Sequence, residues 1–84
     1  MSQIEGSKTI SGTVDTVIYR NEDNGYTVIE LECEDEYISA VGDLGDIKAG
    51  EEVTLIGDYT THSKYGLQFN AIAVSVSFLQ MQAL

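Results

Sequence analysis

Tyr19-Arg20-Asn21-Glu22-Asp23-Asn24-Gly25-Tyr26-Thr27-Val28 is the stretch that decides the fold, because it joins two runs rich in Val, Ile and Tyr through a short polar segment. Asn24-Gly25 sets the turn, since glycine adopts positive φ without steric cost and asparagine tolerates it. Such a pair between two hydrophobic runs is the strongest short-range signal of a β-hairpin. The stretch therefore predicts two antiparallel strands joined by a polar loop.

Apolar and polar residues alternate along most of the chain, which is typical of half-buried strands. The pattern predicts strands over residues 9–20, 26–34, 37–43, 51–60 and 67–78. The predicted inward phases contain Ile10, Gly12, Val14, Val17 and Tyr19; Thr27, Ile29, Leu31 and Cys33; Ile38, Ala40 and Gly42; Val53, Leu55, Gly57 and Tyr59; Phe69, Ile72, Val74, Val76 and Phe78.

The alternation slips at two places, Asp15-Thr16 and between Phe69 and Ile72. Each slip predicts a β-bulge, which bends a strand and increases its twist, as a small closed barrel requires. Residues 43–50 contain Gly45 and Gly50 and little periodicity, so they predict an irregular connection with room for one helical turn over residues 46–49.

Five short strands, no proline and no long helix predict an all-β protein with a small closed barrel. The five-stranded Greek-key barrel called the OB-fold fits the strand count, the long bent first strand and the irregular connection after the third strand. An SH3-like small barrel is the alternative, although its strands are usually shorter. With 84 residues, the chain fits a single domain over residues 1–84.

Composition sets limits on function. Fourteen acidic residues against four basic ones give a formal charge of −10. This balance disfavours tight, autonomous DNA binding, because affinity for phosphates comes from Lys and Arg. The single cysteine, Cys33, cannot form an intramolecular disulfide or a cysteine-based zinc site, and its inward phase indicates a structural thiol. No apolar run could cross a bilayer and no signal peptide is present, so we expect a cytoplasmic protein without a membrane partner.

In an OB-fold, the loops after the first and fourth strands flank the usual ligand face. Here they are residues 20–25 and 60–66. These loops contain three of the five potential cations, with tyrosines beside them, and an aromatic next to a cation can stack a base and neutralise its phosphate. The alternative is a structural role, in which Tyr65 caps the barrel end and Lys64 is a solvated side chain at a hairpin tip. The candidate nucleic-acid-binding residues are Arg20, Tyr26, His62, Lys64 and Tyr65.

A family resemblance centres on these same loops. The stretch at residues 19–28, then Val41-Gly42, Gly50-Glu51, residues 53–57 and His62-Ser63-Lys64-Tyr65-Gly66-Leu67-Gln68-Phe69, resembles the amino-terminal domain of RecD-like ATP-dependent DNA helicases. The likeness extends from about Ile10 to Val76. It implies a superfamily-one helicase, exodeoxyribonuclease V alpha-like, that moves on single-stranded DNA with ATP and magnesium in repair or recombination. Residues 79–84 would begin the connection to its motor domain.

The chain contains no Gly-x-x-x-x-Gly-Lys-Ser/Thr loop, so we predict that it is not an enzyme by itself, and we assign no catalytic residue, metal or cofactor to it. Two hypotheses follow. In the first, the domain is an accessory module that helps its motor guide single-stranded DNA, which it binds weakly. In the second, it is a protein-interaction or intramolecular docking domain without direct nucleic-acid contact, and its acidic face packs on a basic surface of the motor or of a partner; that face contains Glu30, Glu32, Glu34, Asp35 and Glu36.

Overall fold

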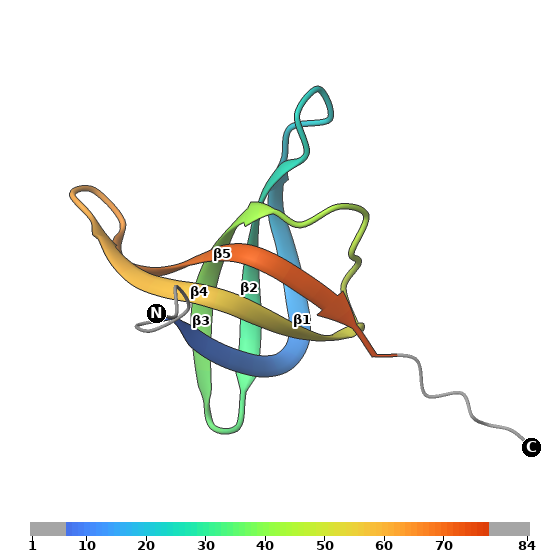
Figure 1. Ribbon diagram of the computed structural model, residues 1–84, viewed down its shortest axis with the longest axis horizontal. Helices are drawn as coiled ribbons and strands as arrows, with labels where there is room; N and C mark the ends of the chain where they lie inside the picture. Colours follow the sequence, from blue (N-terminus) through green and yellow to red (C-terminus); the bar gives the residue numbers. More distant parts are fainter. Residues whose placement is uncertain (1–6, 78–84) are drawn as a thin grey trace, which may run out of the picture.

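Five strands close into a single barrel in the computed structural model, which describes residues 7–77 (Figure 1). They are β1 (Lys8–Arg20), β2 (Tyr26–Cys33), β3 (Glu36–Asp43), β4 (Glu52–His62) and β5 (Gly66–Val76). Around the barrel the order is β1-β2-β3-β5-β4, and β4 pairs back with β1. All pairings are antiparallel except β3 with β5. The all-β prediction of a five-stranded closed barrel with the OB-fold is therefore confirmed.

The predicted first hairpin forms where Asn24-Gly25 places it. The backbone N–H of Gly25 donates to the carbonyl of Asn21, and that of Asn21 donates to the carbonyl of Tyr26, both at 2.8 Å. Gly25 has a φ of 80°, and an added Cβ there would lie 2.5 Å from a carboxylate oxygen of Asp43. Only glycine therefore fits this position without displacing a neighbour.

Strand β1 contains two irregularities where the sequence predicted one. The first lies between Val14 and Thr16, so the predicted bulge at Asp15 is confirmed. The second lies between Val17 and Tyr19 and was not predicted. This second irregularity reverses the side of the strand to which the last side chains of β1 point. Tyr19 lies on the outer surface and is 51% exposed, so its predicted inward position is wrong. Arg20 is partly buried instead.

The barrel interior contains the apolar residues that the alternation predicted for β2, β3 and β4, except Tyr59. That ring is 38% exposed and meets Phe69 edge-on, so its predicted inward position is wrong. The fully buried side chains include one polar group, that of Thr27, whose hydroxyl donates to the carbonyl of Gly25 at 2.8 Å. The buried core cluster consists of Val14, Ile29, Leu31, Ala40, Leu44, Ile47, Val53, Leu55, Phe69 and Ala71.

The connection between β3 and β4 contributes two of these core residues. Leu44 and Ile47 are 1% and 3% exposed, although no periodic pattern in this segment predicted their burial. Turns at Gly45-Asp46 and at Ala49-Gly50 shape the segment, so the predicted helical turn over residues 46–49 is wrong. The connection packs two apolar side chains into the core, and the turns between them leave no run of helical hydrogen bonds.

Strand β5 contains the second predicted bulge, but one residue there faces the other way. Gly57 pairs with Ala71 and Ile56 pairs with Ala73, so Ile72 is the extra residue. It is 74% exposed, and its predicted inward position is wrong, whereas Val74 and Val76 pack against the core as predicted. Phe78 and the predicted connection at residues 79–84 lie outside the described residues. In residues 7–77, no helix has the length and apolarity to span a bilayer.

Candidate nucleic-acid interface

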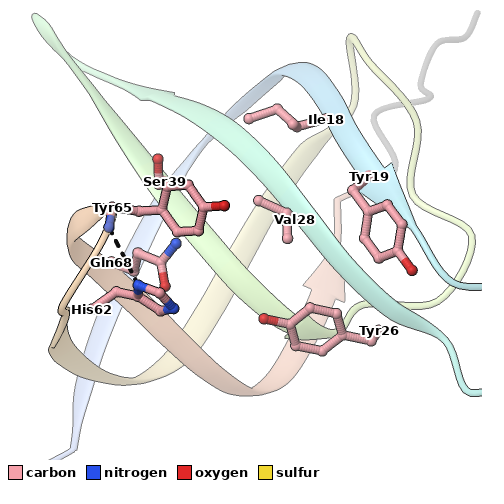
Figure 2. Close-up of a pocket in the computed structure, with 8 residues that line it drawn as sticks. All are labelled: Ile18, Tyr19, Tyr26, Val28, Ser39, His62, Tyr65 and Gln68. Carbon is pink, nitrogen blue, oxygen red and sulfur yellow. Dashed lines mark hydrogen bonds between the residues drawn. The ribbon is translucent and has the colours of Figure 1, made fainter.

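A groove of about 400 Å³ lies on the outer surface of β2 and β3, between the end of β1 and the β4–β5 hairpin (Figure 2). This is the face that OB-folds use for oligonucleotides, flanked by the loops that follow β1 and β4. Half of its eight lining residues have aromatic rings, and none is an acidic residue, a lysine or an arginine. The lining consists of Ile18, Tyr19, Tyr26, Val28, Ser39, His62, Tyr65 and Gln68.

Tyr19 and Tyr26 form one wall of the groove. The second bulge in β1 turns Tyr19 outward, where it pairs in register with Val28, and Tyr26 begins β2 directly after the turn. Their side chains are 51% and 42% exposed. Tyr26 was a predicted site residue, whereas Tyr19 was predicted to lie inside the barrel and was not among the candidates.

His62 and Tyr65 form the opposite wall, at the tip of the β4–β5 hairpin (Figure 2). His62 pairs with Gly66, and Ser63, Lys64 and Tyr65 make the turn. The two rings lie 4.8 Å apart at an angle of 38°. Tyr65 is 66% exposed, and Nζ of Lys64 lies 5.6 Å from its ring centre. The hairpin thus presents a largely exposed aromatic ring with a cation over it.

The floor between the two walls combines apolar and polar groups. Val28 supplies the apolar surface, while Ser39 of β3 and Gln68 of β5 place a hydroxyl and an amide at the groove (Figure 2). Such groups can exchange hydrogen bonds with the edges of a base. Ser39 and Gln68 were missed from the sequence, because the only signal for them is their outward phase on strands whose neighbours around the barrel were unknown.

Arg20 lies apart from this groove. A terminal guanidinium nitrogen of Arg20 donates to the carbonyl of Ile47 in the β3–β4 connection, and its Nε is buried without a hydrogen-bond partner. The side chain lines a separate depression together with Asn21 and Asp46. Of the five predicted site residues, the structure therefore brings Tyr26, His62 and Tyr65 together, places Lys64 beside Tyr65, and gives Arg20 a contact within the fold.

Acidic residues lie farther along the same outer surface. Glu30 and Glu32 share the outward phase of β2 with Tyr26 and Val28. The carboxylate of Glu32 and, to a lesser extent, that of Asp15 raise the pKa of the exposed Tyr37, which pairs with Glu32. These carboxylates would repel phosphate, so an anionic ligand would be confined to the aromatic end of the surface.

Cys33 is half-buried against the core, and this burial raises the pKa of its thiol, with a further contribution from Glu36. A reactive cysteine needs the opposite shift. Within residues 7–77, no three His, Cys, Asp or Glu side chains come together as a metal site would require.

Comparison with known proteins agrees with this geometry. Residues 7–77 match the family described as the OB-fold domain of the ATP-dependent DNA helicase YrrC. Among solved structures, the chain is similar to the dimeric N-terminal domain of the PriB protein from Thermoanaerobacter tencongensis, with a TM-score of 0.64 and 18% sequence identity. That superposition covers 87% of this chain and 97% of the other, and it shows a shared fold.

Proposed function

Since the chain belongs to the family of OB-fold domains of the ATP-dependent DNA helicase YrrC, we propose that it is a non-catalytic accessory domain that guides single-stranded DNA for a helicase motor. In this proposal the domain lies at the amino terminus of a RecD-like, superfamily-one helicase that acts in repair or recombination. ATP and magnesium belong to the motor domain of the same parent protein, which is also the main partner of the barrel.

The aromatic groove is the observation that carries this proposal. Tyr19 and Tyr26 stand on one wall and Tyr65 on the other, so successive bases can stack on rings that belong to the sheet and to the hairpin. Each stacked base contributes about 1–3 kcal/mol in single-strand binding, largely without regard to sequence. Lys64 lies where it can meet the phosphate next to a base on Tyr65.

The negative charge of the domain makes the proposed binding weak and limits it to a few nucleotides. The protein carries a formal charge of −10, and Lys64 is the cation placed beside the groove rings in the part of the chain that the structure describes. Glu30 and Glu32 continue the same surface and repel further phosphates. We therefore propose a contact of few nucleotides that helps a strand enter or leave the motor, with the main affinity supplied by the motor itself.

Fluorescence anisotropy with a labelled oligo-dT at low salt tests this function. The double variant Lys64→Glu, Tyr65→Ala should lose most of the affinity of the wild-type domain. The matched control is Lys48→Glu, Tyr37→Ala, which alters the net charge equally and removes an exposed tyrosine outside the groove. Absence of binding by the wild type, or an equal loss in both double variants, would rule out the groove as a DNA site.

A docking function is the second candidate, and the acidic surroundings of Tyr37 favour it. The pKa of this exposed tyrosine is raised by the carboxylates of Glu32, Asp15 and Glu30. The face therefore combines aromatic area with negative charge, as docking on a basic protein surface would require. The isolated motor domain should then bind the barrel, and Glu30→Lys, Glu32→Lys should weaken that complex. No measurable complex by calorimetry would remove this candidate.

A further inference from the structure

His62, the single histidine of the chain, accepts two hydrogen bonds from the backbone of its own hairpin. The N–H of Lys64 donates to its Nδ1 at 3.0 Å. The N–H of Tyr65 donates to the same atom at 3.2 Å, the bond drawn as a dashed line in Figure 2. A backbone N–H can only donate, so Nδ1 must hold a free lone pair. The ring is then neutral, with its hydrogen on Nε2.

We propose that His62 is a positioning residue that acts in its neutral form, holding Tyr65 in the groove until protonation of Nδ1 releases it. The rings of His62 and Tyr65 lie 4.8 Å apart, and Tyr65 is 66% exposed, so little packing against the barrel fixes its ring. The two bonds to Nδ1 fix the backbone from which the Tyr65 side chain projects. The consequence for DNA rests on the proposed function, whereas the bond to Nδ1 belongs to the free protein.

The other loop beside the groove uses the same device with a different residue type. Asn21 Oδ1 accepts from the N–H of Asp23, and Asn24 Oδ1 accepts from the N–H of Tyr26, both at 2.9 Å. An amide oxygen keeps its lone pairs through the physiological pH range, but an imidazole changes charge between about pH 5 and pH 8. Acid should therefore affect the Tyr65 wall of the groove and spare the Tyr26 wall.

The groups around His62 bear on whether acid should strengthen or weaken DNA binding. Protonation would add a positive charge close to Lys64, and an imidazolium that touched phosphate would strengthen DNA binding in acid. A positioning role predicts the reverse, because the acceptor for two N–H groups disappears. Two neighbours that face His62, Ser39 of β3 and Gln68 of β5, are uncharged. The titratable or charged groups around it are Lys64 and Tyr65 on its own hairpin, Tyr19 and Tyr26 across the groove, and Asp58 on the same face of β4.

Two substitutions separate the roles in a binding experiment. His62→Asn keeps an acceptor for the N–H groups and cannot be protonated, whereas His62→Lys keeps a cation and has no acceptor. With labelled oligo-dT, we expect wild-type affinity to fall about fivefold or more from about pH 8 to about pH 5, the affinity of H62N to be the same at the two pH values, and H62K to bind about tenfold more weakly than H62N, the equivalent of losing one stacked base. Tighter wild-type binding in acid, or rescue by H62K but not by H62N, would overturn the proposal.

Two measurements without DNA test the bond itself. The ¹⁵N chemical shifts of the His62 ring should show an unprotonated Nδ1 at pH 8. At that pH the amides of Lys64 and Tyr65 should exchange slowly in the wild type and in H62N, and quickly in H62K. A protonated Nδ1, or equal exchange in all three proteins, would refute the positioning role. If DNA fails to bind while the exchange pattern holds, the proposed function fails and the role of His62 in the free protein stands.

Discussion

Replacing Arg20 with methionine tests whether the two cations predicted at this face, Arg20 and Lys64, serve different purposes. Methionine retains much of the apolar stem of arginine and removes the guanidinium that donates to the carbonyl of Ile47. Lys64→Met is the matched change, since it removes one positive charge from an exposed side chain beside the groove.

The structure sets the size of the effect. A hydrogen bond from a charged donor contributes about 1.5–3 kcal/mol, and its loss leaves the carbonyl of Ile47 without that partner. Methionine also removes the buried Nε that lacks a hydrogen-bond partner, which stabilises the folded state of the variant by about 1 kcal/mol. The net loss of unfolding free energy should be about 0.5–2 kcal/mol. For a domain of this size, that lowers the melting temperature by about 2–16 °C.

Urea unfolding followed by circular dichroism, together with anisotropy on labelled oligo-dT, measures both properties. R20M should lower the unfolding midpoint and leave the dissociation constant within about twofold of the wild type. Lys64→Met should change stability by less than about 0.5 kcal/mol, as surface substitutions usually do, while weakening binding. An unchanged midpoint in R20M, or a loss of affinity as large as that of Lys64→Met, would contradict the structural role of Arg20.

Three further predictions concern the groove, the barrel closure and the thiol. Affinity for oligo-dT should depend little on salt, with a log–log slope no steeper than about −0.7, the value for one phosphate contact on a single strand; a slope of several units in a salt titration would mean that other cations participate. Gly57→Ala should destabilise the barrel by about 1–3 kcal/mol in urea unfolding, because the added Cβ would lie 2.0 Å from the carbonyl oxygen of Asn70, and an unchanged midpoint would argue against that close approach. Since burial and Glu36 raise the pKa of the Cys33 thiol in the folded state, iodoacetamide should alkylate it more slowly at pH 8 in the folded domain than in the urea-unfolded chain, and equal rates would show that the fold does not protect it.

Local patterns predicted the hairpins and the core of this protein well. Asn24-Gly25 placed the first turn, and the alternation of Thr27, Ile29 and Leu31 identified residues that are fully buried. The reason is that turn chemistry and strand periodicity depend on neighbours in the sequence. Three of the five proposed site residues also line the groove, because the strand order of the fold brings the loops after β1 and β4 to one face.

The errors in side-chain orientation arose at β-bulges, where one extra residue in a strand decides which way the following side chains point. The second bulge of β1 exposed Tyr19 and turned Arg20 toward the β3–β4 connection, which removed a cation from the predicted site and added an aromatic ring. A bulge shifts every following side chain by one position, so one missed bulge inverts the end of a strand. At Ile72 the bulge was predicted, but the sequence did not reveal which residue left the interior.

The burial of Leu44 and Ile47 was missed for another reason. These residues belong to a connection without periodicity, and they are buried because the connection crosses residues that are distant in sequence. Only the closed barrel brings Arg20 within reach of Ile47. Tertiary contacts of this kind leave no local pattern, so hydrophobicity in an irregular segment was the single available signal.

The route by which the barrel closes has a mechanical consequence for a strand lying in the groove. Tyr19 and Tyr26 belong to the antiparallel unit β1-β2-β3, whereas His62 and Tyr65 belong to the β4–β5 ribbon, and these two halves meet on one side through the parallel pairs Ala40 with Phe69 and Val41 with Asn70. The two walls of the groove therefore belong to different halves of a closed barrel. If a strand binds there as we propose, a force that separates the walls would load the two parallel pairs on one side of the barrel and the six β1–β4 pairs on the other.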